Sequence, residues 1–181
     1  ATQIGAQSFT DIHDLVDGSD FEAAIVVSPV QSHHSISSFL SRNGIHHLVE
    51  TSFASSLTQA QDMVDTARKN NVIIKVAENF FRMPVDRIVS KIRESGDVGD
   101  IKRIVSYADH AGYHNNSRWI AFAGTHPNYV RAIEHTIPTA AFNHTAERHY
   151  ETETYQARFF EFPDNLLIVD HSANIKGFLG R

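Results

Sequence analysis

Ala23-Ala24-Ile25-Val26-Val27 is a short, continuous apolar run that ends at Ser28-Pro29. A run of this kind, bounded by turn residues, is typical of a parallel strand buried on both faces. Ser32 can cap a helix over residues 33–42, which Asn43-Gly44 would end. The stretch therefore predicts a strand followed by a helix, the unit from which layered parallel sheets are built.

The same unit recurs twice along the chain. Residues 45–49 predict a second strand, and a helix that begins at Ser56 or Thr58 follows it. Residues 72–76 predict a third strand, after which Pro84 opens a helix. The apolar residues of that helix that we expect to face inward are Ile88, Val89 and Ile92.

The alternation of predicted strands and helices stops after Gly99. Residues 101–107 predict a strand, and residues 109–128 read as an irregular segment rich in His, Asn and Gly. From there the pattern is strand after strand, over residues 141–150, 154–162 and 166–173. Alternating strands and helices give a parallel sheet, whereas consecutive strands give an antiparallel one.

The sequence thus predicts an α/β fold with two domains. Residues 1–100 would form a parallel sheet with helices, and residues 101–181 an α+β domain with an open, mainly antiparallel sheet. The alternation of apolar residues over 155–162 is imperfect, so both faces of that strand are expected to be covered. A second subunit is the natural cover, and we predict a homo-oligomer formed through this open sheet.

Composition excludes several classes of function. The 181 residues carry a net charge of −5 with scattered Lys and Arg, so a nucleic-acid partner is not expected. No apolar run approaches the roughly 18 residues that a membrane span requires. The absence of Cys excludes disulfides and thiol nucleophiles and fits a cytoplasmic location. The chain has no initiator Met and ends abruptly, so we expect it to be part of a longer or processed chain.

Polar residues follow each of the three apolar strands. They are Ser28-Pro29-Val30-Gln31-Ser32-His33, then Glu50-Thr51-Ser52, then Glu78-Asn79. The carboxyl ends of parallel strands line one crevice, where ligands bind. A small-molecule or dinucleotide site would need such a cluster; the alternative is that these residues only form turns and helix caps.

The order of these motifs resembles the glucose-fructose oxidoreductase and inositol dehydrogenase (Gfo/Idh/MocA) family. Pro29-x-x-x-His33 is similar to the family pattern T-P-N-x-x-H, and residues 44–52 are similar to G-K-H-V-x-x-E-K-P. The succession continues through Asn79 and Pro84, and the resemblance covers about residues 10–107.

The resemblance implies the remainder of an NAD(P)-binding Rossmann domain followed by a substrate and oligomerisation domain. Family members oxidise or reduce a carbinol or carbonyl carbon of sugars, polyols and related small molecules, with NAD or NADP as cofactor. The positions that would contact this cofactor are Ser28, Pro29, Gln31, His33, Glu50, Thr51 and Asn79.

Two departures from the family pattern bear on catalysis. The G-x-G-x-x-[GA] loop that binds the pyrophosphate is absent, because Gly5 and Gly18 are isolated. The catalytic Lys of the family is Thr51 here, followed by Ser52 in place of Pro. A neutral Thr hydroxyl cannot replace Lys as a proton donor.

Another group must therefore handle the proton if the chain belongs to an enzyme. Asp109-His110-Ala111-Gly112-Tyr113-His114 carries two imidazoles and a phenol just beyond the first strand of the second domain. We predict His110, Tyr113 and His114 as candidate acid–base residues. A metal site on the two histidines is disfavoured because no helical pattern fixes their spacing, and a polar surface loop remains the plain alternative.

Two functions follow from these observations. The first is an NAD(P)-dependent oxidoreductase acting on a small hydroxylated substrate, which the polar cluster at 109–118 favours. The second is a non-catalytic relative that keeps the fold and binds a ligand or partner, which Thr51 favours.

Overall fold

The computed structural model describes residues 5–107, 112–145 and 148–173. The chain divides into two compact units, Ala1–Glu78 and Asn79–Arg181. The helix that begins at Pro84 belongs to the second unit, so the units divide earlier than the change of sequence rhythm near residue 100.

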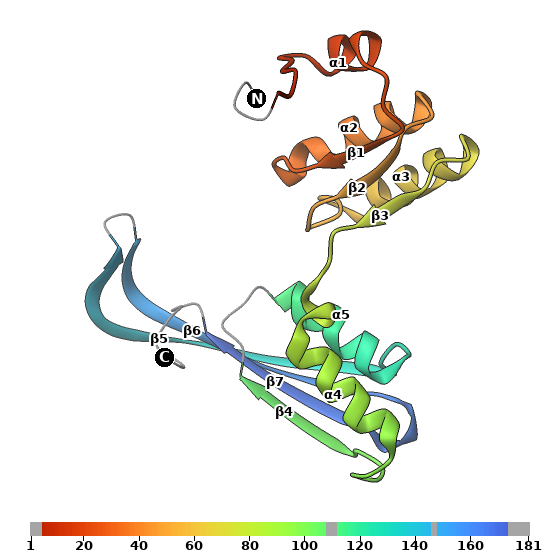
Figure 1. Ribbon diagram of the computed structural model, residues 1–181. Helices are drawn as coiled ribbons and strands as arrows, with labels where there is room; N and C mark the ends of the chain where they lie inside the picture. The colour runs from red at the N-terminus through yellow and green to blue at the C-terminus, as the bar shows by residue number, and fades with distance from the viewer. Residues whose placement is uncertain (1–4, 108–111, 146–147, 174–181) are drawn as a thin grey trace. The chain divides into compact units, whose positions relative to one another are not determined.

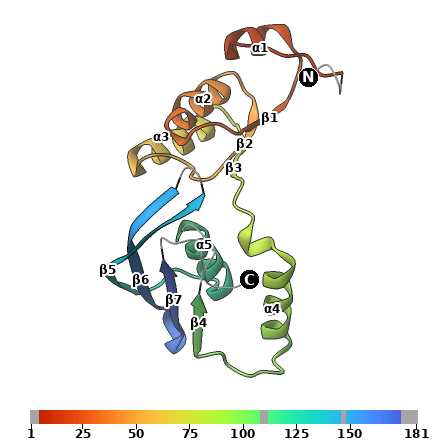
Figure 2. The same cartoon turned by 90° about the vertical axis from the view of Figure 1, so that its left-hand side faces the viewer.

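The first unit is built on a parallel sheet with the strand order β1-β2-β3. Its elements are α1 (Ile12–Gly18), β1 (Ala23–Val26), α2 (Val30–Arg42), β2 (His46–Val49), α3 (Leu57–Lys69) and β3 (Ile74–Val76). In register, Ala24 lies opposite His47, which lies opposite Ile74. Helices α2 and α3 lie together on one face of this sheet (Figures 1 and 2). The predicted strand–helix alternation is confirmed.

The core of this unit lies between the sheet and the two helices. Its buried members are Val26, Leu40, Ile45, Val49 and Met63. However, Ile25 on β1 is 71% exposed, and Ile73, just before β3, is 59% exposed. The prediction that the first strand is buried on both faces is therefore wrong, because α2 and α3 cover only one of them.

The two helix starts differ in how they are capped. Ser56 accepts a hydrogen bond from the Gln59 amide at 3.2 Å and caps α3, as predicted. Helix α2 instead begins at Val30, directly after Pro29, whose φ of −57° suits the entry to a helix. Ser32 therefore lies in the first turn, and its hydroxyl contacts the Pro29 carbonyl at 2.8 Å.

The second unit is built on a mixed sheet with the strand order β4-β7-β6-β5. Its elements are η2 (Phe80–Arg82), α4 (Pro84–Ser95), β4 (Arg103–Tyr107), α5 (Gly112–Ala123), β5 (Tyr129–Thr145), β6 (Arg148–Glu161), η3 (Pro163–Asn165) and β7 (Leu167–Ala173). Strand β7 runs parallel to β4 and antiparallel to β6, which in turn pairs with β5 in a long hairpin (Figure 1). The open, mainly antiparallel sheet is confirmed.

Three local predictions in this unit are wrong. The segment predicted as irregular contains α5, which Trp119 anchors against Phe160 and Ile168. The predicted strand over residues 141–150 instead spans the end of β5 and the start of β6, because the sequence there has no Gly or Pro to signal a turn. Finally, Ile88, Val89 and Ile92 of α4 are exposed rather than inward. The helix contacts α5 through its polar residues instead, with Asp86 bound to Arg118 and Arg93 bound to the Phe122 carbonyl.

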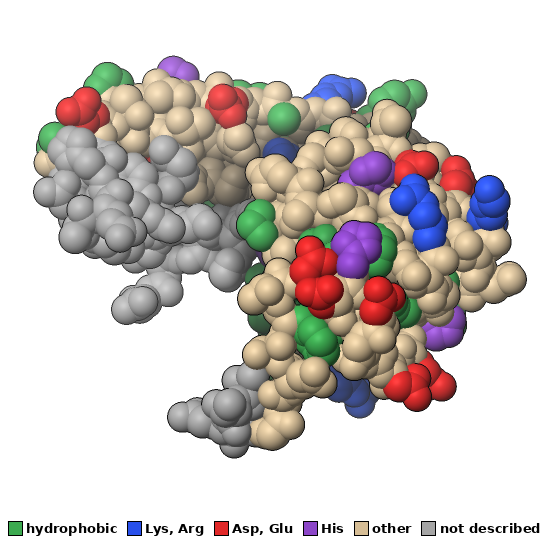
Figure 3. Space-filling view, turned by 90° about the horizontal axis from the view of Figure 1, so that it is seen from above, with side chains coloured by type: hydrophobic (Ala, Val, Ile, Leu, Met, Phe, Trp, Pro, Cys, Tyr) green, Lys and Arg blue, Asp and Glu red, His purple; other side chains and the backbone are tan. Residues whose placement is uncertain are grey.

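None of the described helices is long and apolar enough to cross a membrane. On the face seen in Figure 3, acidic, basic and histidine side chains are interspersed rather than gathered by sign.

Candidate functional site

The ends of the three parallel strands lie at one edge of the sheet in the first unit. The Glu50 amide donates to the Val26 carbonyl at 2.9 Å, and the Ala77 amide donates to the Val49 carbonyl at 2.7 Å. The predicted residues that follow β1 and β2 are therefore brought together at the edge where parallel sheets bind ligands.

His33 connects the two loops at this edge. Its Nε2 lies 2.8 Å from the Ser28 carbonyl oxygen, and its Nδ1 lies 2.9 Å from the Ser52 carbonyl oxygen. The side chain is fully buried on α2. A neutral imidazole carries one N–H, so it donates to one carbonyl at a time, whereas the protonated ring donates to both. His33 thus holds the loops that carry the other candidate residues.

The half-buried side chains on these loops are polar and contact one another. The Thr51 hydroxyl and amide both donate to Oε1 of Glu50, at 2.8 and 3.0 Å. The Ser28 hydroxyl accepts from Ser32 at 2.9 Å. Pro29 precedes α2, and Gln31 is exposed in its first turn. The edge therefore offers a carboxylate and hydroxyls, groups that bind ribose and carboxamide functions.

A buried Ser–His pair links α2 to the start of β2. His47 Nδ1 is 2.9 Å from the Ile45 carbonyl and must donate to it, so Nε2 accepts the Ser37 hydroxyl proton across 2.6 Å. Burial lowers the pKa of His47, and the neighbouring His46 lowers it further, against the raising effect of the Ile45 carbonyl. Both side chains are buried, so the pair serves the core rather than a substrate.

In the second unit, the first turn of α5 carries two of the three candidate acid–base residues. The His114 ring stacks on Phe80, with centroids 3.9 Å apart, and the Tyr113 ring lies 4.2 Å away. Asn79, the exposed candidate from the third strand end, directly precedes Phe80. His110 lies outside the described residues. The structure therefore places Asn79 in the same unit as Tyr113 and His114, next to the ring on which His114 stacks.

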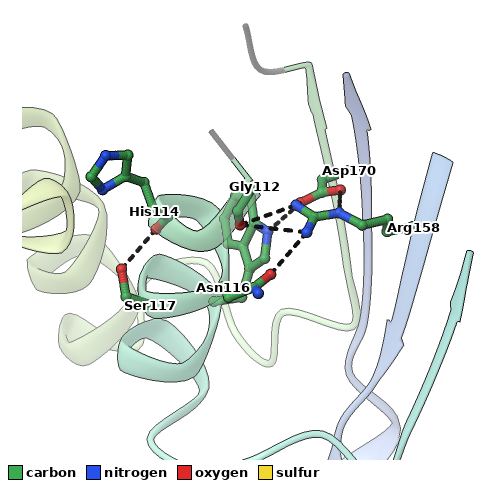
Figure 4. A network of polar contacts seen from close by, with 7 residues as sticks. Gly112, His114, Asn116, Ser117, Arg158 and Asp170 are labelled. Atoms are coloured by element: carbon green, nitrogen blue, oxygen red, sulfur yellow. Dashed lines mark hydrogen bonds and ion pairs between the residues drawn. The ribbon is translucent and has the colours of Figure 1, made fainter. Parts of the chain in front are cut away.

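A charged network fixes the start of α5 against the sheet (Figure 4). Arg158 on β6 donates to both carboxylate oxygens of Asp170 on β7, at 2.8 and 2.6 Å. The same guanidinium reaches the Gly112 carbonyl at 3.3 Å and Asn116 Oδ1 at 3.0 Å. Trp119 Nε1 also donates to Asp170, at 3.0 Å. A Cβ added to Gly112 would lie 2.8 Å from Arg158, so the glycine makes room for this contact.

Sequence reasoning missed this network. Asp170 ends the apolar run Leu166-Leu167-Ile168-Val169, and it is 1% exposed. A carboxylate at the end of a buried strand demands a cationic partner, which is a usable signal. Its partner, Arg158, lies in another strand 12 residues away, and only the β6–β7 register brings the two together.

Comparison with known proteins finds a family match for the first unit. Residues 1–78 match the family GFO_IDH_MocA, described as an oxidoreductase family with an NAD-binding Rossmann fold. The first unit is therefore similar to the NAD-binding domain of the Gfo/Idh/MocA oxidoreductases. The family resemblance expected from the sequence and the Rossmann-type fold are thus confirmed.

Individual relatives share limited identity with the chain. A scyllo-inositol 2-dehydrogenase (NADP(+)) of Bacillus subtilis is 25% identical over 118 residues, which are 65% of this chain and 34% of the relative. A levoglucosan dehydrogenase of Pseudarthrobacter phenanthrenivorans is 26% identical over 100 residues, 55% of this chain and 25% of the relative. The crystal structure of a myo-inositol 2-dehydrogenase from Lactobacillus plantarum superposes with a TM-score of 0.70 at 16% identity, covering 90% of this chain and 54% of that one. The chain thus spans about a third or less of these curated relatives and about half of the solved structure.

Proposed function

We propose that this chain is part of an NAD(P)-dependent oxidoreductase that acts on a carbinol or carbonyl carbon of a sugar- or polyol-like molecule. The observation that carries the proposal is the match of residues 1–78 to an NAD-binding family, combined with the polar cluster at the ends of β1 and β2. Inositol and levoglucosan dehydrogenases among the relatives support the substrate class.

The residues at the strand ends fit one part of a dinucleotide. Ser28 and the Glu50–Thr51 pair offer half-buried hydroxyl and carboxylate groups suited to ribose and nicotinamide contacts. A bound nicotinamide would supply the hydride acceptor or donor. The chain has no Gly-rich turn to bind the pyrophosphate, whose recognition rests on main-chain N–H groups.

We therefore expect the 181-residue chain alone to bind NADH weakly or not at all. Isothermal titration of the purified chain with NADH and NADPH measures this directly. Micromolar affinity for either nucleotide would contradict the expectation and would mean that another loop holds the phosphates.

Proton transfer is assigned to the first turn of α5 and the residues before it. When a carbinol is oxidised, the hydride leaves carbon and the hydroxyl proton must go to a base. His114 and Tyr113, together with His110, are the candidates, because Thr51 is neutral and its hydroxyl is bound to Glu50. The Phe80 stack and the Arg158 contacts at Gly112 and Asn116 would hold this turn in place.

The test is turnover by the longest product of the gene, because the 181-residue chain alone is expected to bind the cofactor weakly. Scyllo-inositol, myo-inositol and levoglucosan are offered with NAD or NADP, and the absorbance of the reduced nicotinamide is followed. Loss of the essential acid–base group among His110→Ala, Tyr113→Phe and His114→Ala should lower turnover about 10²- to 10⁴-fold without loss of cofactor binding. His126→Ala, in an exposed position, is the matched control. Wild-type turnover in all three variants would contradict the assignment.

A non-catalytic relative is the second candidate, and Thr51 in place of the family's Lys favours it. In that case no substrate would be turned over, yet polyol binding would still shift the unfolding temperature. The substitution Thr51→Lys distinguishes the two candidate functions. Only a protein that lost catalysis when it lost the Lys should gain turnover from this substitution.

A further inference from the structure

A cavity of about 420 Å³ lies within the second unit, among α4, β4 and α5. This volume falls in the range of small-molecule pockets. Its apolar wall includes Phe81, Val89, Ile104, Trp119 and Phe122. On α5 the lining begins at Arg118, so the cavity is separate from the candidate acid–base residues in the first turn of that helix.

The polar part of the cavity is an incompletely bonded ion pair. Arg118 Nε donates to Oδ1 of Asp86 at 2.8 Å, and the two side chains are 24% and 15% exposed. Oδ2 of Asp86 is buried and has no hydrogen-bond partner among the described residues. A buried carboxylate oxygen without a hydrogen-bond donor is unfavourable, so a ligand that donates a hydrogen bond to this atom would be stabilised.

The guanidinium adds the complementary function. Arg118 binds Asp86 through Nε, and within the described part of the chain its two terminal nitrogens make no hydrogen bond. Its Cζ lies 5.6 Å from the centre of the Trp119 ring, which holds it beside the apolar wall. A free acceptor and free donors thus stand side by side.

We infer that this cavity is a binding site for a small neutral molecule with an apolar ring and one hydroxyl or carboxamide group. Such a group accepts from Arg118 and donates to Asp86 once a turn of the carboxyl brings Oδ2 to the cavity, while the ring fills the space beside Trp119 and Phe122. A carboxylate would face Asp86 and be repelled, and a purely apolar molecule would leave Oδ2 unbonded. The site does not depend on the dinucleotide or on the proposed reaction.

The test uses three probes with the same ring: benzamide, benzoate and toluene. Trp119 is the only Trp, so its indole N–H gives a single signal in a ¹H–¹⁵N spectrum of the chain. Benzamide should shift this signal and the amides of Ser90 and Ile104 saturably, with millimolar affinity. Benzoate and toluene should each bind about tenfold more weakly, because each loses the bond to Asp86.

Two variants check the assignment. Asp86→Asn should weaken benzamide about tenfold, whereas Asp65→Asn, which alters an exposed Arg68–Asp65 pair in the other unit, should leave it unchanged. If Asp86→Asn does not fold, Ser90→Phe decides, because its ring fills the cavity and should abolish binding. Equal affinity for the three probes, no shift with benzamide, or full binding by the folded variants would overturn the inference.

Discussion

His47 shows how a single side chain couples the first unit to pH. Burial lowers its pKa in the folded protein below the ordinary value of about 6.5. The unfolded chain therefore takes up a proton before the folded one does as the pH falls. The free energy of unfolding contributed by neutral His47 is complete above pH ~6.5 and is lost as the pH drops from there toward the folded pKa.

We expect the urea midpoint of the chain to fall between about pH 7.5 and about pH 5, and to fall less in His47→Gln. The variant removes the titrating group while keeping a polar side chain that can bond to Ser37. His126→Gln, in an exposed position, should retain the wild-type pH dependence. Identical pH dependence in His47→Gln and wild type would show that the group does not act in this way.

At the level of elements, α5 depends on the strands beneath it. Arg158 is the only described cation bonded to buried Asp170, and it also reaches Gly112 and Asn116 of α5. Among the described side chains, Arg158→Met would leave the carboxylate with Trp119 as its remaining donor. We expect a loss of about 3–5 kcal/mol in the free energy of unfolding.

Urea denaturation measures that loss, and Arg131→Met is the matched control. Arg131 makes an exposed pair with Glu161 in the same sheet, at 3.5 Å, and its removal should change stability by about 1 kcal/mol or less. Amide exchange should also speed up in the first turn of α5 of Arg158→Met. Equal stability of the two variants would mean that the network does not hold the helix.

The sequence predicts best the helices and strands whose conformation depends mainly on their own residues. The apolar runs at 23–27 and 72–76 mark strands because their residues are apolar without interruption. Helix α5 escapes prediction because Gly112, Asn115 and Asn116 are poor helix formers, and its stability comes from Trp119 packing against distant strands. The apolar residues Ile88, Val89 and Ile92 of α4 have the predicted helical spacing. That spacing does not determine whether another element covers them, and they are exposed.

The candidate site divides in the same way. Positions at strand ends follow from local pattern, so Ser28, Glu50 and Thr51 are found at the expected edge. The internal bonds of His33 to two carbonyls, and the stack of His114 on Phe80, depend on how loops return through space. No spacing rule in the sequence carries that information.

At the scale of the whole molecule, one face of the sheet in the second unit carries exposed apolar residues that could contact another copy of the chain. The β4-β7-β6-β5 register aligns Tyr107, His171, Ala157 and Ile133 in one row. Because side chains alternate along a strand, this row lies on the face opposite to Arg158 and Asp170, which contact α5. Tyr107 and Ile133 are 70% and 64% exposed.

An apolar sheet face of this kind favours association with a second copy, since two such faces bury each other's residues symmetrically. We therefore predict that the chain self-associates and that Ile133→Lys, which places a charge on this face of β5, shifts it toward the monomer. Val130→Lys is the matched control, because Val130 is also exposed on β5 but pairs with Phe160 on the other face. Sedimentation equilibrium over a range of concentrations gives the association constant of each variant. A wild-type chain that stays monomeric throughout, or equal association by the two variants, would exclude this face as the contact.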